Sequence, residues 1–310
     1  MLGMTAFHIS IIMDYLSSGS VWPLQDKEGE FAVKIYMHWD MEGVSGIFTR
    51  EHVWYWEEGT RKHIADEGRQ LLMADINSAV KAALEAGADE VIVCDTHHGG
   101  GNIELDKMFS DPRIIYHVTS RDANGRWMPG LDDTVDGLML MGHHAKAGTK
   151  GEFLPHTWTT EWADFRINDQ SVGEMGIEAC YAGYWNIPPI MAHGTELACR
   201  EAEDLFPGIV TAGVKHAKNH DLCSGLSADS AHCLIAQKIA EAIDKARNRK
   251  ITPYKPALPM TVTIRMKTAE LAENASKKPQ VQRIDEYTVE GKVERQCDVV
   301  KWILGTGLPD

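Results

Sequence analysis

Residues 32–43, AVKIYMHWDMEG, decide the fold class. The first eight of them have the apolar and aromatic character of a buried strand, and Asp40 and Glu42 follow directly. In an extended chain residues i and i+2 point the same way, so both carboxylates can enter one cleft, while Gly43 lets the backbone turn away. The stretch therefore predicts a buried strand that ends in a polar site.

Strands alternate with helical patterns on the carboxyl-terminal side of this stretch. We expect helices at about residues 60–86, 173–185, 195–206 and 227–249. The expected strands are 90–94, 113–118, 137–141, 164–168, 189–192 and 210–214. This alternation predicts an α/β fold around a largely parallel sheet, with helices on both faces. Beyond a proline-containing linker at 252–259, residues 260–266, 268–275 and 293–304 predict a small α+β unit.

The sequence thus divides into residues 1–31, an α/β catalytic domain at 32–250 and a smaller C-terminal α+β unit at 251–310. Residues 1–31 carry no periodic pattern, and one hypothesis is that they come from a wrongly assigned gene start. Lys27-Glu28-Gly29 fits a purine-rich ribosome-binding stretch, and Val33 fits a GTG start codon. N-terminal sequencing of the native protein that shows Met1 or Met4 would exclude this.

Composition narrows the partners and the compartment. Asp and Glu number 45 against 31 Lys and Arg, and this net charge of −14 argues against a nucleic-acid partner. There is no basic start of a signal peptide and no apolar run near the ~20 residues that cross a bilayer, so we expect a cytoplasmic protein without a membrane partner. The six cysteines form no C-x-x-C pair and are expected to be reduced thiols.

Polar residues follow further strands in the same way. His97 comes shortly after the second strand, in Asp95-Thr96-His97-His98, and His144 comes after the fourth, in Gly142-His143-His144. Because ligands bind beyond the carboxyl ends of parallel strands, these side chains should meet. Taken alone, each motif is more often a solvated turn, a loop hydrogen bond or a strand cap, and Glu174 at a helix start could simply favour the helix dipole.

Taken together, five residues offer a mixed imidazole and carboxylate set that suits zinc and is compatible with manganese or cobalt. A single open catalytic zinc keeps about three protein ligands, whereas two ions ~3.5–4 Å apart can share five. We therefore predict two metal ions bridged by Asp40. The expected ligands are Asp40, Glu42, His97, His144 and Glu174.

From Lys34 onward the chain resembles the zinc-dependent D-aminopeptidases, also described as dipeptide-transport-associated proteins. The matching segments follow the family's order. They are residues 34–46 (KIYMHWDMEGVSG), 93–97 (VCDTH), 130–137 (GLDDTVDG), 141–149 (MGHHAKAGT), Pro155-His156, 167–176 (INDQSVGEMG) and 201–205 (EAEDL).

The resemblance implies a Rossmann-like domain with a smaller companion, a dinuclear zinc site on the same five ligands and a catalytic role for His156. It also implies a homo-oligomer, for which a ring is one form. The implied activity is release of N-terminal D-amino acids from short peptides or amino-acid amides. The chain departs from the family at His38-Trp39, His98, His143 and Thr195, which puts the D-preference in question. Of these, His98 is expected to be exposed.

Several functions stay open at this point. The same site could belong to an amidase of a non-peptide amide or lactam, to a non-catalytic metal-stabilised peptide-binding protein, or to a dinuclear phosphoesterase. Against the last stands the lack of an evident Arg or Lys phosphate clamp near the ligands. His156 could hold the oxyanion, protonate the leaving amine or attack covalently, and the sequence does not choose among these roles.

Overall fold

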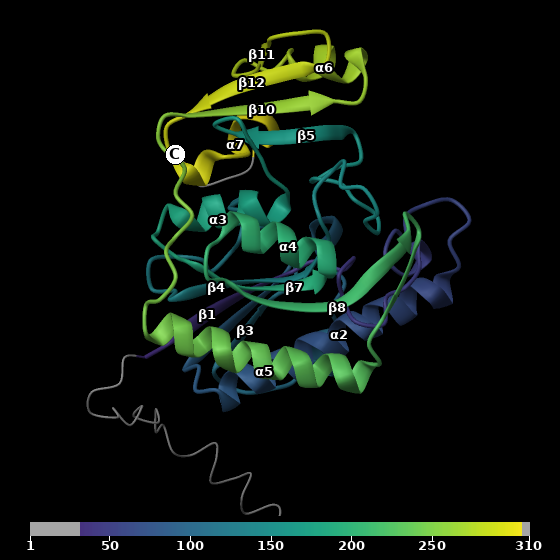
Figure 1. Cartoon of the computed structure of the whole chain (residues 1–310), viewed down its shortest axis with the longest axis vertical. Helices are drawn as coiled ribbons and strands as arrows, with labels where there is room; N and C mark the ends of the chain where they lie inside the picture. Colours follow the sequence, from purple (N-terminus) through teal and green to yellow (C-terminus); the bar gives the residue numbers. More distant parts are fainter. Residues whose placement is uncertain (1–31, 306–310) are drawn as a thin grey trace, which may run out of the picture. The chain divides into compact units, whose positions relative to one another are not determined.

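The computed structural model describes residues 32–305 of the chain. Its centre is a seven-stranded sheet with the order β3-β2-β1-β4-β7-β8-β9 (Figure 1). The strands are β1 (Lys34–Trp39), β2 (Glu90–Asp95), β3 (Ile114–His117), β4 (Gly137–His143), β7 (Pro189–Thr195), β8 (Val210–Asn219) and β9 (Leu222–Gly225). The prediction for residues 1–31, including the gene-start hypothesis, lies outside the described residues.

The strand order places a binding crevice. β1 pairs in parallel with β2 on one side and with β4 on the other, and only the edge strand β9 runs antiparallel. From β1 the chain proceeds outward to β2 and β3, then returns to the other side of β1 for β4, β7 and β8. At such a reversal the loops after two neighbouring strands diverge, so the crevice lies beyond the carboxyl ends of β1 and β4.

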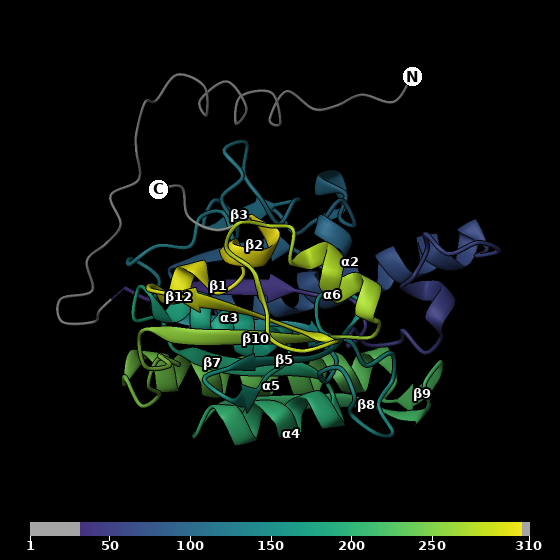
Figure 2. The same ribbon diagram turned by 90° about the horizontal axis from the view of Figure 1, so that it is seen from above.

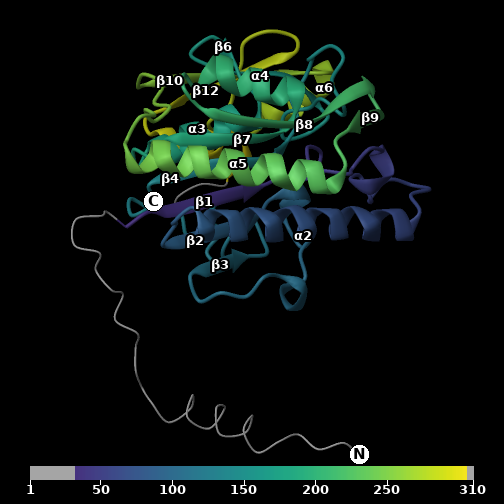
Figure 3. The same cartoon turned by 60° about the horizontal axis from the view of Figure 1, so that its bottom comes forward.

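Helices cover both faces of this sheet (Figures 1 and 3). α2 (Lys62–Glu85) and α5 (Ala228–Arg247) pack together on one face, and α3 (Glu174–Gly183) and α4 (Glu196–Leu205) lie on the other. Side chains of β1 alternate between the two cores. Ile35 and Met37 pack with the α2 and α5 core, whereas Tyr36 packs with the α3 and α4 core. The predicted α/β class is therefore confirmed.

A second, antiparallel sheet has the order β11-β12-β10-β5-β6 and lies beyond α3 and α4 (Figures 1 and 2). Its strands are β5 (Trp162–Ile167), β6 (Gln170–Ser171), β10 (Met260–Met266), β11 (Gln282–Arg283) and β12 (Thr288–Val293), joined by the short helices α6 (Ala269–Ala275) and α7 (Lys301–Leu304). Strands from before and after residue 250 thus share one sheet, and the domain boundary placed there stays a prediction.

The short elements were the hardest to foresee. The hairpin strand β9 and the 3-10 turns η1 (Arg50–His52), η2 (His97–Gly99), η3 (Leu105–Lys107) and η4 (Gln296–Asp298) were not predicted. Each has four residues or fewer, which is too short to show a period. Among the helices of residues 32–305, none combines the length and the apolar character that crossing a bilayer would take.

Candidate metal centre

Two glycines let the loops after β1 and β4 approach each other. The amide of Gly43 donates a hydrogen bond to the carbonyl of Gly142 at 2.6 Å. Gly142 has φ +72°, and a Cβ at that position would lie 2.1 Å from the carbonyl oxygen of Asp40. Only a residue without a side chain fits this contact. The close backbone packing brings Asp40, after β1, beside His144, after β4.

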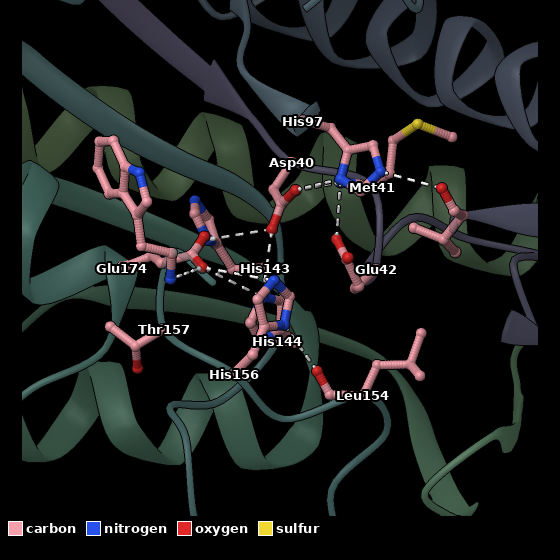
Figure 4. A network of polar contacts seen from close by, with 12 residues as sticks. Asp40, Met41, Glu42, His97, His143, His144, Leu154, His156, Thr157 and Glu174 are labelled. Atoms are coloured by element: carbon pink, nitrogen blue, oxygen red, sulfur yellow. Dashed lines mark hydrogen bonds and ion pairs between the residues drawn. The ribbon is translucent and has the colours of Figure 1, made fainter. Parts of the chain in front are cut away.

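Asp40 lies at the centre of the polar side chains in the crevice (Figure 4). Its Oδ1 is 2.9 Å from Nδ1 of His97, and its Oδ2 is 3.5 Å from Nε2 of His144. The two oxygens of one carboxylate thus face two different imidazoles. This is the arrangement that a bridging carboxylate needs.

The other two carboxylates flank Asp40. Oε2 of Glu42 is 3.2 Å from Nδ1 of His97, and Oε1 of Glu42 accepts a hydrogen bond from the indole of Trp54 at 2.8 Å. Glu174 is the first residue of α3, and its Oε1 is 3.7 Å from Nε2 of His144. Each carboxylate therefore has one oxygen directed at an imidazole nitrogen of the site.

The three histidines share one orientation. In each, one ring nitrogen lies within hydrogen-bond distance of a backbone carbonyl, which leaves the other nitrogen directed at the carboxylates. The pairs are His97 Nε2 with Val53 at 3.1 Å, His144 Nδ1 with Ala145 at 2.9 Å and His156 Nδ1 with Leu154 at 2.9 Å. A carbonyl on the outer nitrogen fixes the tautomer in which the inner nitrogen is free to bind a metal or a proton.

These residues fit a pair of divalent cations. Asp40 Oδ2, Glu42 Oε2 and His144 Nε2 are buried without a hydrogen-bond partner, a costly state that a cation would relieve. Three overlapping sets have ligand atoms within 4.8 Å of one another: Asp40, Glu42 and His97; Asp40, His144 and Glu174; and Glu42, His144 and His156. We call these six residues the pocket cluster. Asp40 belongs to two of the sets.

Without a metal ion, protons on the histidines balance the negative charge of the carboxylates. Burial alone would lower the pKa of His97, but the carboxylates of Glu42 and Asp40 raise it well above its ordinary value. In the same way, burial opposes and Glu174 and Glu42 favour the charged form of His144, whose pKa is raised to about 9. Cations and protons therefore compete for these imidazoles, so we expect metal affinity to fall in acid.

The family match rests on most of the described chain. Residues 33–304 match the model of the peptidase family M55, described as D-aminopeptidase. The chain belongs to this family of hydrolases. It is 34% identical over 223 residues to a D-aminopeptidase of Bacillus subtilis (strain 168), covering 71% of this chain and 78% of the relative.

A solved structure of the family agrees. It is described as Zn-dependent D-aminopeptidase DppA from Bacillus subtilis, a self-compartmentalizing protease. The two structures superpose with a TM-score of 0.80 at 29% identity, over 88% of this chain and 96% of that one. The resemblance stated from the sequence is thereby confirmed, together with the Rossmann-like fold.

The pocket cluster borders a cavity of about 630 Å³. Four tryptophans line it, and the indoles explain why the cavity can hold an apolar side chain beside a polar centre. They are Trp54, Trp56, Trp127 and Trp158. These residues were not predicted from the sequence, because they come from loops. The aromatic run Trp54-Tyr55-Trp56 is the sequence signal that could have indicated two of them.

Basic side chains also line this cavity. Arg50 is paired with Glu57 and Asp221, whereas the exposed side chains of Arg121 and Lys267 have no ion pair with any residue of 32–305. Arg121 precedes β4 in the chain and Lys267 follows β10, so residues more than a hundred positions apart meet at one cavity. The local sequence around each residue does not predict that the two line the same cavity.

A second set of buried groups lies next to the pocket cluster. His38, His143 and Glu178 are fully or almost fully buried, and both imidazoles contact the same carboxylate oxygen, Glu178 Oε2, at 3.1 Å. We call these residues the buried triad. The sequence marked His38 and His143 as departures from the family, but it did not identify Glu178. Its position one helical turn after Glu174 was the available signal.

All six residues singled out from the sequence, His156 included, meet in the pocket cluster; their roles as ligands or catalysts stay predictions. Asp95, from the same strand end as His97, instead accepts hydrogen bonds from the backbone and side chain of Asn102. His98 is exposed, as expected, and stacks on Trp56. Thr195 caps α4 and does not line the cavity.

Proposed function

We propose that this protein is a dinuclear zinc aminopeptidase that releases the N-terminal, D-configured residue of short peptides or amino-acid amides. The observation that carries the proposal is the position of Asp40. Its two carboxylate oxygens face the imidazoles of His97 and His144, at 2.9 and 3.5 Å. A carboxylate shared between two ligand sets is typical of hydrolases with two metal ions.

The ligand sets divide naturally between two ions. Asp40, Glu42 and His97 would hold one ion, and Asp40, His144 and Glu174 would hold the other. When bound, zinc supplies Lewis-acid chemistry, which polarises a carbonyl and makes water more acidic. The imidazole and carboxylate ligands suit zinc, and they are also compatible with manganese or cobalt. The zinc dependence of the solved relative supports zinc.

We assign His156 the transfer of a proton to the leaving amine. With Nδ1 turned to the carbonyl of Leu154, its Nε2 is free and lies 3.7 Å from Oε1 of Glu174. The ring stacks on His144 with centroids 4.1 Å apart, and the edge of Trp54 contacts it from another direction. An imidazole fixed in this way can hold and deliver a proton at one stated atom, Nε2.

The cavity suits a small zwitterionic substrate. The tryptophans can pack against one side chain, and the uncommitted cations Arg121 and Lys267 can attract the C-terminal carboxylate of a short peptide. The carboxylates of the pocket cluster can attract the free N-terminal amine. Such a substrate would be bound at both ends, which explains cleavage next to the N-terminus.

Two alternatives are less well supported. The cations of the cavity do not argue against a phosphoesterase, because Arg121 and Lys267 could attract a phosphate as well as a carboxylate. Against it stands the family, which is described as D-aminopeptidase. A purely binding role leaves His156 without a purpose, since its free nitrogen adjoins the ligands. An amidase that uses the same metal centre would differ only in its substrate, so the two are distinguished by comparing lactams and non-peptide amides with aminoacyl amides.

The assembly and the compartment remain predictions. The solved relative is described as self-compartmentalizing, which supports a homo-oligomer for this chain, and a ring would enclose the active sites. The expected cytoplasmic location rests on the sequence alone.

The test compares chelator-stripped and zinc-reconstituted protein on aminoacyl amides with a free or an N-acetylated amine. We expect no turnover after stripping, full recovery once zinc fills the pocket cluster, and no cleavage of the acetylated substrates. Full activity of the stripped protein, or equal cleavage of acetylated substrates, would contradict the proposal. Cleavage of lactams or non-peptide amides in preference to aminoacyl amides would favour the amidase.

A further inference from the structure

The buried triad has the geometry of a metal site rather than of a hydrogen-bonded cluster. His38 Nδ1 and His143 Nε2 are each 3.1 Å from Glu178 Oε2, and these three atoms lie within 4.8 Å of one another. Yet neither nitrogen of either imidazole, nor this carboxylate oxygen, makes a hydrogen bond within the described part of the chain. The two 3.1 Å contacts are therefore ion pairs that fall short of regular hydrogen-bond geometry.

Ligands of a shared cation have this relation. Two atoms bound to one tetrahedral zinc at 2.0–2.2 Å stand about 3.3–3.6 Å apart, close to the separation seen here, and their lone pairs point at the ion instead of at each other. Two imidazoles and a carboxylate are also a donor set that zinc accepts. An ion would bind three of the buried polar atoms that make no regular hydrogen bond among residues 32–305, namely His38 Nδ1, His143 Nε2 and Glu178 Oε2, which otherwise have only ion-pair contacts with one another.

The triad comes from the same elements as one half of the pocket cluster, with two histidines and one carboxylate in place of one histidine and two carboxylates. Asp40, His144 and Glu174 come from the end of β1, the end of β4 and the start of α3. His38, His143 and Glu178 come from the same three elements, displaced by two residues, one residue and one helical turn. The same elements thus present two imidazole and carboxylate sets, one deeper in the protein than the other.

An ion could reach the triad from the cavity. Glu178 is among the residues that line the cavity of about 630 Å³, next to Trp127 and Trp158. His143 connects the two sets, because its Nε2 faces Glu178 and its Nδ1 lies 4.0 Å from Oδ2 of Asp40. The triad is thus buried but accessible from the side on which metals must enter the pocket cluster.

We propose that the buried triad is a third divalent-cation site, suited to zinc, that joins β1, β4 and α3 behind the pocket cluster. The proposal goes beyond the aminopeptidase function and does not depend on it. An ion there would fix the strand ends and the helix that carry Asp40, His144 and Glu174. We assign it a structural role because His38 and His143 are fully buried, so that no substrate can contact them.

The experiment counts and locates zinc in the full chain. Protein saturated with zinc and freed of excess metal is analysed for zinc per subunit, and crystals of it are measured on both sides of the zinc absorption edge. We expect three zinc ions per subunit and an anomalous peak between His38 and Glu178. The variant His38→Gln should lose one ion of three. His117→Gln, which changes a half-buried histidine of β3 outside both clusters, should keep all three.

Two ions per subunit in the saturated wild type, with no peak at the triad, would overturn the proposal. The wild-type map decides this even where His38→Gln does not fold. The variant Asp40→Asn separates this inference from the proposed function, because it changes a ligand of the pocket cluster and none of the triad. A peak at the triad beside an empty pocket cluster in the wild type would refute the dinuclear centre while supporting the third site.

Discussion

The buried triad comes from β1, β4 and α3, which with their ends also supply Asp40, His144 and Glu174 of the pocket cluster, but the two sets differ in how their histidines are held. In the pocket cluster, each histidine has a backbone carbonyl at its outer nitrogen, so its inner nitrogen has a fixed role. In the triad, the imidazoles of His38 and His143 are ion-paired with Glu178, and neither has a regular hydrogen bond to any residue between 32 and 305. The comparison teaches that residue type and strand position do not by themselves determine chemistry.

Access to the cavity completes the difference. His156 is half-buried and Glu174 borders the cavity, whereas His38 and His143 are closed off from solvent. A substrate can approach the first set and not the imidazoles of the second. Catalysis is therefore expected from the pocket cluster alone, and the variants below test that division.

The largest effect is expected from Asp40→Asn. The amide has one oxygen instead of two anionic ones, so it cannot bridge two cations, and loss of the metal-dependent step should lower kcat/KM by about 10³-fold or more. Zinc content and amide hydrolysis measure this together. Asp136→Asn, which alters a carboxylate at the opposite end of β1, should leave both unchanged. Activity near the wild-type level in Asp40→Asn would contradict the proposal that Asp40 is shared by two metal ions.

His156→Ala should separate proton transfer from metal binding. Aminoacyl amides need a proton on the leaving amine, so their hydrolysis should slow by about 10²–10³-fold. Aminoacyl p-nitroanilides have a leaving group that departs with little help and should slow far less. Rates on the two substrates are compared at unchanged zinc content, with the exposed His216→Ala as the control. Equal losses on both substrates would assign His156 to another role.

Gly142→Ala tests the backbone contact that brings the strand ends together. A methyl group there would meet the carbonyl of Asp40 at 2.1 Å, and the residue would also be forced to keep φ +72°. We expect the free energy of unfolding to fall by about 2–4 kcal/mol. Gly148→Ala has φ +81° but open surroundings, so it should cost only about 1 kcal/mol. Denaturant titration of the two variants isolates the contact, and equal losses would contradict it.

The smallest effect is expected from Arg121→Gln. Removing one exposed cation at the cavity should raise KM for dipeptides by a few-fold, and the difference should shrink at high salt. Amino-acid amides, which have no terminal carboxylate, should be unaffected. Equal changes for dipeptides and amides would show that Arg121 does not recognise the carboxylate.

The residues that could be predicted from the sequence follow strands directly. Asp40, Glu42, His97 and His144 were found because parallel strands end at one edge, and the alternation in β1 follows from the two-residue period of strands. What could not be predicted depends on tertiary packing. Trp54, Arg121 and Lys267 reach the cavity from separate loops, and the tautomers of the histidines depend on carbonyls such as that of Val53, from another part of the chain.

The family match and the pocket cluster together lead to one direct measurement. Zinc-loaded protein is incubated with a panel of D- and L-aminoacyl amides and dipeptides, and the release of free amino acid is followed. The account predicts rapid release from D-configured N-termini, slower release from their L-counterparts and none after chelation of the metal. A protein that holds zinc at Asp40 and yet cleaves no member of the panel would contradict the aminopeptidase function.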